Sequence, residues 1–271
     1  MKQKKENELM VVKSNSLIKQ SKYSFTVVQH RIIQMLIALV SMYDTEFHEF
    51  TFKVGDFCEL CGIETNNGKN YINIKNAIQS LSDKSSWIVV DGYETLFRWI
   101  EKPKINKTTG EIILKLDSNL KEYLLQLGQD FTRYPFRNTM LFHSSYSFRL
   151  YDLLECVHYH DNEAYDYKIS LKELKVRMGA KEDCTWSHFR QRALEPAIAD
   201  INNYTYKKIS FEAKKENGRA TDTVEFHIES KPVEERVRLD YDLFGDKNSY
   251  KILKALLEES DVTSKIDTPH G

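Results

Sequence analysis

The fold is decided by residues 170–201, which read SLKELKVRMGAKEDCTWSHFRQRALEPAIADI. Ser170 and Glu173 have the spacing of a capping box, in which the serine hydroxyl accepts the Glu173 amide and the glutamate carboxylate reaches back. The short helix that begins there is predicted to end at Gly179, because glycine is typical of the position after a helix. A polar loop then leads to a second helix, predicted over residues 185–201. Two helices joined in this way form a helix-turn-helix.

The segments around this helix-turn-helix complete a larger unit. A strand is predicted immediately before it, over residues 165–169. Two more strands are predicted after it, over residues 206–213 and 223–229, joined by the turn-forming residues 214–219. A long helix is predicted to precede all of these, within residues 138–160. The order of helix, strand, two helices and hairpin is that of a winged helix-turn-helix domain.

The same order is found in the first half of the chain. It predicts, in turn, a helix over residues 24–43, a strand over 47–54, a short helix over 56–61 ending at Gly62, a helix over 71–81, and strands over 87–90, 95–100 and 111–116. A repeated order of elements indicates a repeated domain. We therefore predict an α+β fold of tandem winged helix-turn-helix domains, at residues 23–117 and 118–232. A basic N-terminal arm is predicted over residues 1–22, and a charged, partly disordered tail over residues 233–271.

The composition is that of a globular chain. Of 271 residues, 41% are hydrophobic and only ten are glycine and five proline, which excludes a wholly disordered or collagen-like chain. A membrane-spanning helix needs ~20 consecutive apolar residues, and the sequence has no such run. The N-terminus lacks the apolar core of a secretory signal. Four scattered cysteines do not suggest a disulfide framework, so a reducing cytosol is the expected compartment.

The formal net charge is −1, but the charge is unevenly distributed. Residues 1–22 contain six lysines and two glutamates, whereas residues 229–271 contain ten acidic and seven basic residues. The chain before this acidic end is therefore slightly basic. Such a distribution is compatible with binding to nucleic acid without requiring it.

The second helix of a helix-turn-helix presents its N-terminal residues to base edges in the major groove. In this sequence the candidate DNA-binding residues there are Thr185, Trp186, Ser187, His188, Arg190, Gln191 and Arg192. Arginine can make paired hydrogen bonds to guanine, and glutamine can do so to adenine. On a regular helix Arg190 and Arg192 point about 200° apart, so one is expected to read a base and the other to contact phosphate. The alternative is a solvated helix face without a function.

Pro196 lies within this predicted helix and cannot donate a backbone hydrogen bond. The helix is expected either to kink at Pro196 or to restart with Pro196 at its first position. In both cases the exposed part of the helix ends near Leu194.

Basic residues on the hairpins are candidates for phosphate contacts, which supply affinity and register without sequence information. In the second domain these are Lys207, Lys208, Lys214, Lys215 and Arg219. In the first domain the equivalent helix offers Lys69, Asn70, Asn73, Lys75 and Asn76, and the hairpin offers Lys102, Lys104 and Lys107. Because the first helix is rich in asparagine, we expect less specific DNA contacts from it, or a protein interface. Ordinary surface residues are the alternative for each.

His158-Tyr159-His160 matches the spacing of the metal-binding histidines of rolling-circle nicking enzymes. In those enzymes the histidines lie on a strand, whereas here they end a predicted helix, where residues two apart point in different directions. The context therefore argues against a nicking enzyme, and we predict no catalytic residues.

Cys58 and Cys61 could begin a zinc site that Cys184 and His188 would complete. A structural zinc site normally shows a second closely spaced pair, and both cysteines lie in a predicted helix, where they pack as small apolar residues. The sequence also lacks the glycine-rich phosphate loop of an ATPase. We predict no metal and no cofactor.

Four segments together resemble a known family. They are VKSNSLI at residues 12–18, SFTVVQHR at 24–31, SSYSFRLYDLL at 144–154 and FRQRALEPAIADIN at 189–202. In this order and at these separations they resemble the initiator replication proteins of iteron-containing plasmids, the Rep_3 or RepB-like group. The resemblance covers about residues 10–232.

The resemblance implies that the second domain reads one part of a repeated DNA site and the first grips an adjacent part. It implies a monomer that initiates plasmid replication at origin direct repeats (iterons), and a dimer, paired mainly through the first domain, that represses its own gene. It also implies a bacterial cytoplasmic protein whose partners are the host replication initiator, the replicative helicase and chaperones. A winged-helix transcriptional regulator remains the alternative function.

Overall fold

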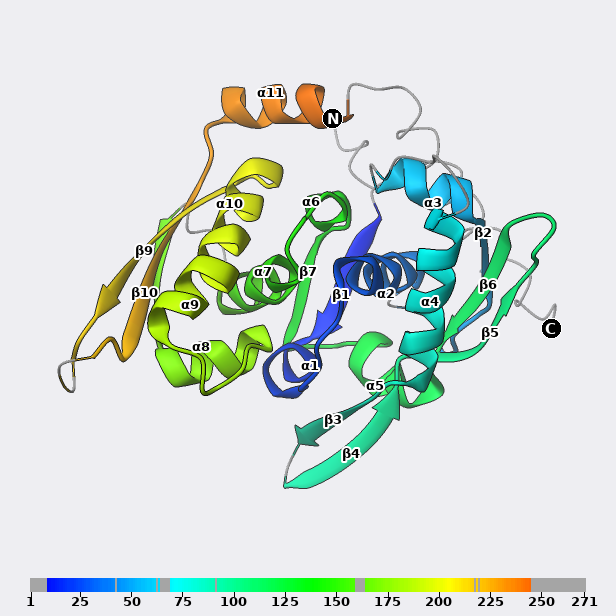
Figure 1. Ribbon diagram of the computed structural model, residues 1–271, viewed down its shortest axis with the longest axis horizontal. Helices are drawn as coiled ribbons and strands as arrows, with labels where there is room; N and C mark the ends of the chain where they lie inside the picture. The colour runs from blue at the N-terminus through cyan, green and yellow to red at the C-terminus, as the bar shows by residue number, and fades with distance from the viewer. Residues whose placement is uncertain are drawn as a thin grey trace.

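The computed structural model describes residues 9–41, 43–61, 63, 69–90, 92–158, 164–216, 218 and 220–244. Two units with the same order of elements lie next to each other, one on each side of the view in Figure 1. In the first unit the order is α2 (Val27–Leu39), β2 (Phe50–Lys53), α3 (Val54–Leu60), α4 (Lys69–Asp83), β5 (Ile100–Ile105) and β6 (Glu111–Leu116). In the second it is α7 (Ser145–Val157), β8 (Ala164–Ser170), α8 (Leu171–Met178), α9 (Trp186–Phe189), α10 (Glu195–Tyr204), β9 (Lys207–Lys214) and β10 (Thr223–Ser230).

The sheets of the two units have equivalent topology. Each has three antiparallel strands, in the order β2-β6-β5 in the first unit and β8-β10-β9 in the second. In both sheets the first strand pairs with the last, and the hairpin between the second and third strands forms the wing. The prediction of tandem winged helix-turn-helix domains is confirmed.

Local sequence signals set the ends of the main helices. Thr26 and Gln29 form a complete capping box at the start of α2. At the start of α8 only half of the predicted box exists, because the Ser170 hydroxyl accepts the Glu173 amide at 3.2 Å but the Glu173 carboxylate binds Arg177 instead, at 2.9 Å. The helix ends at Gly179 as predicted, in the left-handed conformation with φ of +70°. Gly62, the equivalent expectation in the first unit, lies outside the described residues.

The first unit contains a hairpin that is separate from its wing. β3 (Ser85–Val90) and β4 (Tyr93–Arg98) form a two-stranded sheet of their own, whereas the wing is the hairpin of β5 and β6. The predicted strand over residues 95–100 is therefore divided at Trp99. The Trp99 indole is buried and donates to the Ser86 hydroxyl at 2.9 Å, which anchors the chain between the two sheets.

The expectation of a basic arm over residues 1–22 is wrong for residues 10–20. They form β1 (Met10–Ser14) and α1 (Asn15–Gln20), and β1 pairs with β7 (Phe131–Pro135). Burial of four apolar side chains explains the difference, namely Val11, Val12, Leu17 and Ile18. Residues 1–8 lie outside the described residues.

Short helices connect the two units, and another follows the second. η1 (Ser118–Leu120), α5 (Lys121–Leu124) and α6 (Arg137–Met140) lie on the chain between the units. α11 (Val233–Phe244) occupies the start of the predicted tail, and Asp240 anchors it to Arg137 at 3.2 Å and to the Tyr206 hydroxyl at 2.7 Å. Residues 245–271 lie outside the described residues. Among the described helices, none has the length and apolar character needed to cross a bilayer.

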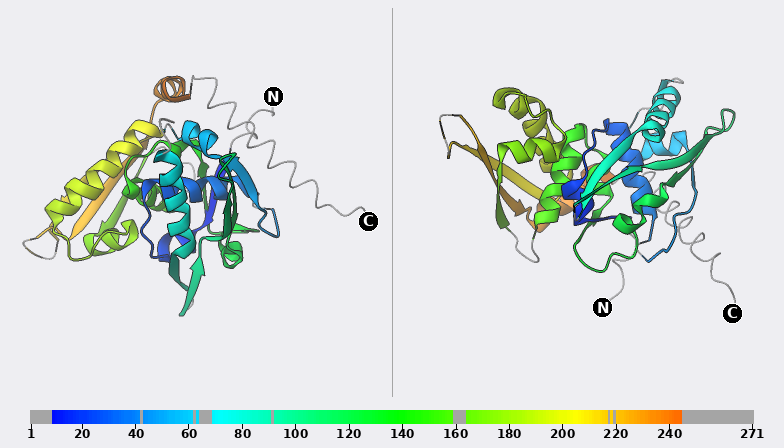
Figure 2. Two further views of the ribbon diagram at one scale, coloured as in Figure 1. Left: turned by 45° about the vertical axis from the view of Figure 1, so that its right-hand side comes forward. Right: turned by 90° about the horizontal axis from the view of Figure 1, so that it is seen from below.

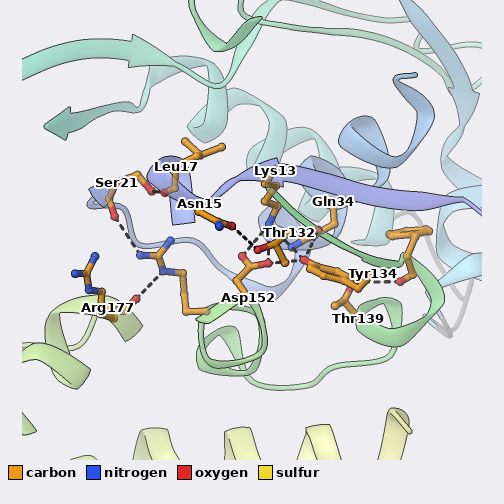
Figure 3. A network of polar contacts seen from close by, with 12 residues as sticks. Lys13, Asn15, Leu17, Ser21, Gln34, Thr132, Tyr134, Thr139, Asp152 and Arg177 are labelled. Atoms are coloured by element: carbon orange, nitrogen blue, oxygen red, sulfur yellow. Dashed lines mark hydrogen bonds and ion pairs between the residues drawn. The ribbon is translucent and has the colours of Figure 1, made fainter. Parts of the chain in front are cut away.

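A buried polar network joins the two units (Figure 3). The Lys13 ammonium on β1 donates to both carboxylate oxygens of Asp152 on α7, at 3.0 and 2.8 Å. The hydroxyl of Tyr134 on β7 also donates to Asp152, and its oxygen lies 3.1 Å from the side-chain oxygen of Gln34 on α2. The side chains of Lys13 and Asp152 are only 5% and 1% exposed. The N-terminal strand, the connecting segment and both first helices of the units thus meet at one charge pair.

A second contact docks the helix-turn-helix of the second unit on residues 21–23. The Arg149 guanidinium donates to the backbone oxygens of Ser21 and Arg177, at 3.1 and 2.9 Å, and lies 4.2 Å from the centre of the Tyr23 ring. A Cβ on Gly179 would lie 2.9 Å from the Tyr23 backbone oxygen, so only glycine allows this approach. Arg149 and Gly179 thus pack the second unit against the segment that leads into α2 of the first.

Candidate nucleic-acid interface

The second helix of the second helix-turn-helix is built from three consecutive segments. Thr185 is the N-cap of α9, and its hydroxyl accepts the His188 amide at 3.3 Å. A π-helical turn, Arg190–Leu194, then joins α9 to α10. At the end of this turn the Glu195 amide donates to the Arg190 backbone oxygen, five residues back. Pro196 follows within the first turn of α10. We call residues 185–204 the recognition helix.

Pro196 accounts for the wide turn. Its ring would clash with the backbone oxygen four residues before it in a regular α-helix, and it lacks an amide proton. One π-helical turn moves that oxygen away while the helix continues. The sequence predicts a kink or a restart of the helix at Pro196. The structure instead has a π-helical turn just before Pro196, and the helix continues through it.

The exposed face of the recognition helix carries most of the predicted DNA-binding residues. The exposed members are Thr185, Ser187, His188, Arg190, Gln191 and Arg192. Trp186 differs, because its half-buried ring packs against the rings of Phe189 and Phe211 at 6.3 Å. The ring thus helps attach the helix to the wing sheet, and a DNA contact from Trp186 stays a prediction. After Leu194, α10 buries four residues, Ala197, Ile198, Asp200 and Ile201, while Ala199 and Asn203 are exposed, so the expectation that the rest of the helix is packed holds for one face only.

The two arginines of this face are in different electrostatic environments. The Arg190 Nε lies 2.7 Å from the Glu195 Oε1, and both side chains are about half exposed, at 52% and 42%. Arg192 is exposed and has no ion pair among the described residues. Glu195 is a site residue that sequence reasoning missed. Residues five apart do not face each other on a regular helix, and the only signal for the pair was the proline that follows.

Among the described residues, the wing of the second unit contains basic residues both with and without an ion pair. Lys215 is exposed near its tip, and Lys214 contacts the Glu225 carboxylate, which lowers the pKa of that carboxyl. Lys208 is exposed and lies 2.9 Å from Glu229. Arg219 lies outside the described residues.

Lys207 is predicted to contact phosphate, but its side chain points into the second unit and not to solvent. Its side chain is 13% exposed, lies 3.5 Å from the Glu155 carboxylate and approaches the Tyr165 ring at 5.5 Å. The ammonium group is therefore used inside the second unit, and a phosphate contact from it would break this pair.

In the first unit, α4 takes the position of the recognition helix. Lys69, Asn73, Lys75 and Asn76 are exposed on it, and Asn70 is half-buried. The wing adds Lys102 and Lys104 on β5 and Lys107 in the turn after it, all exposed, with Lys104 bound to Glu49 at 2.8 Å. Figure 1 shows α4 and α10 on the same side of the molecule, and the right view of Figure 2 agrees. One duplex lying along this side can therefore contact both units.

Cys58 and Cys61 are the candidates for a zinc site, and His158 and His160 for the metal site of a nicking enzyme. Cys58 and Cys61 are buried in the core, and burial raises the pKa of Cys61 to about 12. His158 ends α7, with its ring 4.8 Å from that of Tyr165. Tyr159 and His160 lie outside the described residues.

One group of possible metal ligands does come together within the described part of the chain. Glu212, Glu225 and His227 on the wing sheet have ligand atoms within 4.8 Å of one another. Lys214 already contacts Glu225 and lies 3.9 Å from Glu212, and Asp166 lies 2.6 Å from His227 Nδ1. Glu225 and His227 thus already have side-chain partners in Lys214 and Asp166, and we assign no metal here.

Comparison with known proteins agrees with this geometry. Residues 10–155 match the family model described as "Initiator Replication protein, WH1", and residues 170–228 match "Initiator Rep protein, WH2". A solved structure described as the Pi initiator protein in complex with iteron DNA is similar, with a TM-score of 0.69 and 19% identity over 83% of this chain and 98% of that one. A search of curated proteins found no match. The chain therefore belongs to the Rep_3 family of initiator replication proteins.

Proposed function

We propose that this protein initiates plasmid replication by binding direct repeats, or iterons, in the plasmid origin. The observation that carries the proposal is the recognition helix, which exposes Arg190, Gln191 and Arg192 and lies on the same side of the molecule as α4. Family membership supports the replication role, and the similar Pi initiator structure contains iteron DNA.

The two units are proposed to divide the work of binding. The recognition helix carries side chains able to form paired hydrogen bonds with guanine and adenine, so the second unit reads the sequence. The α4 helix offers two lysines and short polar side chains, which suit phosphate contacts and register. We expect the contacts of Arg149 and Lys13 between the units to set the spacing between the two DNA contacts.

The proposed mechanism needs no catalytic group. Copies bound to adjacent repeats would bend the DNA, and their binding energy would offset the cost of opening a neighbouring A·T-rich segment. We infer that the protein is not an enzyme. In the bacterial cytoplasm it would then hand the opened origin to the host replication initiator and the replicative helicase.

Plasmid maintenance tests the replication role. A plasmid that carries the DNA flanking this gene, but no initiator gene, is expected to be maintained only when the protein is supplied from a second replicon. If the protein binds that DNA and represses the adjacent promoter but never maintains the plasmid, the winged-helix regulator is the better account.

We further propose that the protein represses its own gene as a dimer formed through the first unit. The observation that favours this interface is the outer face of the β3–β4 hairpin, where Trp87, Val89 and Leu96 point to the same side and are 49%, 38% and 49% exposed. Exposed apolar patches of this kind mark interaction surfaces. Chaperones are then the expected partners for separating the dimer into monomers.

Self-association is expected to fail when a charge is placed on this face. Val89→Lys would bury an ammonium group between two copies, so the dimer dissociation constant should rise at least about tenfold. Sedimentation equilibrium measures this constant. Val233→Lys is the matched control, because Val233 is 61% exposed on α11, away from the hairpin. Equal dimerisation of both variants would rule out the hairpin as the interface.

A further inference from the structure

The Arg190–Glu195 ion pair exists because the recognition helix contains a π-helical turn. On a regular α-helix, residues five apart lie about 140° from each other around the axis, and only residues three or four apart are neighbours. The hydrogen bond from the Glu195 amide to the Arg190 backbone oxygen brings the two residues into line. Their side chains then meet, with 2.7 Å between Arg190 Nε and Glu195 Oε1.

This contact uses one particular part of the guanidinium group. Arginine has five N–H donors in a rigid planar fork, one on Nε and four on the two terminal nitrogens. Glu195 takes the Nε donor, and the terminal nitrogens of Arg190 have no partner among the described residues. Two parallel N–H donors are needed for the O6 and N7 acceptors of guanine. With Nε occupied, the terminal pair is the edge that Arg190 can offer.

The negative charge of Glu195 makes its position significant. A carboxylate on the face that meets DNA repels phosphates and weakens binding to any sequence. Arg192, two residues away, is exposed without an ion pair among the described residues. The ion pair with Glu195 restricts the Arg190 side chain, so Arg190 loses less conformational entropy than Arg192 when it binds a base.

We propose that Glu195 is a positioning residue that orients Arg190 to read a guanine, leaving Arg192 to contact phosphate. The proposal rests on the proposed function, because it requires the recognition helix to lie in the major groove. It decides which of the two arginines reads a base, and it makes Glu195 a determinant of sequence specificity that does not itself touch DNA.

The test is a comparison of Glu195→Ala, Arg190→Ala and Arg192→Ala. Dissociation constants are measured at one fixed salt concentration. The duplexes are the footprinted site, the same site with each base pair changed in turn, and an unrelated sequence. Glu195→Ala is expected to bind the unrelated duplex as tightly as wild type or more tightly, because a negative charge is lost. It should bind the correct site roughly tenfold more weakly, and discriminate less at the base pair that Arg190→Ala also ceases to discriminate.

Glu195→Gln separates positioning from a general effect on the helix. Glutamine keeps an acceptor oxygen for Arg190, so this variant should retain most of the base discrimination. A purely structural role would weaken binding to all duplexes together and lower the melting temperature, which would overturn the proposal.

The remaining outcomes show whether the proposal about Glu195 fails alone or together with the proposed function. If Arg190→Ala loses discrimination but Glu195→Ala keeps it, Glu195 is not a positioning residue and the proposed function stands. If Arg192→Ala alone loses discrimination, the assignment of the two arginines is wrong. If neither arginine variant loses discrimination at any base pair, the recognition helix does not read DNA, and the proposed function fails as well.

Discussion

Asp152→Asn is expected to lower the free energy of unfolding by ~3–5 kcal/mol, the cost of leaving a buried charge without its partner. The substitution leaves the Lys13 ammonium, 5% exposed, facing a neutral amide in place of the carboxylate that now accepts it at 2.8 Å. The Tyr134 hydroxyl also loses its charged acceptor. Urea unfolding followed by circular dichroism measures the change.

The Lys104–Glu49 pair provides the matched control. It has the same N–O distance of 2.8 Å, but its side chains are 58% and 51% exposed. Glu49→Gln should therefore cost no more than about 1 kcal/mol. The double variant Lys13→Met/Asp152→Leu should recover much of the lost stability, because no buried charge remains. If Asp152→Asn and Glu49→Gln have equal effects, the buried pair does not hold the two units together.

The double variant Arg190→Ala/Arg192→Ala is expected to lose most of its preference for the correct DNA site. If each arginine is worth the ~1–3 kcal/mol of a base-reading arginine, the pair should cost roughly 2–6 kcal/mol. That is at least about 30-fold in the dissociation constant. The effect should be largest on the correct site, because base contacts are lost there in addition to charge. Fluorescence anisotropy with specific and unrelated duplexes measures both constants.

Arg133→Ala/Arg238→Ala removes the same charge from other parts of the surface. Arg133 is exposed on β7, and the Arg238 side chain is 85% exposed on α11. This control should weaken both duplexes slightly and equally, through the long-range field alone. Equal losses in the two double variants would mean that the recognition helix contributes charge but no sequence reading.

Much of the fold could be predicted from local signals. The periodic apolar residues of α2, the glycine after α8 and the alternating strand over residues 111–116 each predicted an element that the structure contains. The pairing of β1 with β7 could not be predicted, because its partners are more than 100 residues apart. Lys13 also made β1 look solvent-exposed, and only the distant Asp152 explains its burial.

The site was predictable in outline but not in its contacts. The helix-turn-helix order predicts that residues 185–192 form an exposed helix. It does not predict which of their side chains face the core. The inward positions of Trp186 and Lys207 depend on Phe211, Glu155 and Tyr165, which come from other elements. The Arg190–Glu195 pair depends on a π-helical turn, which helical periodicity does not anticipate.

Footprinting of the purified protein on the DNA flanking its own gene, with and without Mg²⁺ or Mn²⁺, tests the central claim most directly. The account predicts regularly spaced protection over direct repeats, with both strands intact in the presence of either metal. A single inverted-repeat footprint without direct repeats, or a metal-dependent nick in one strand, would contradict it.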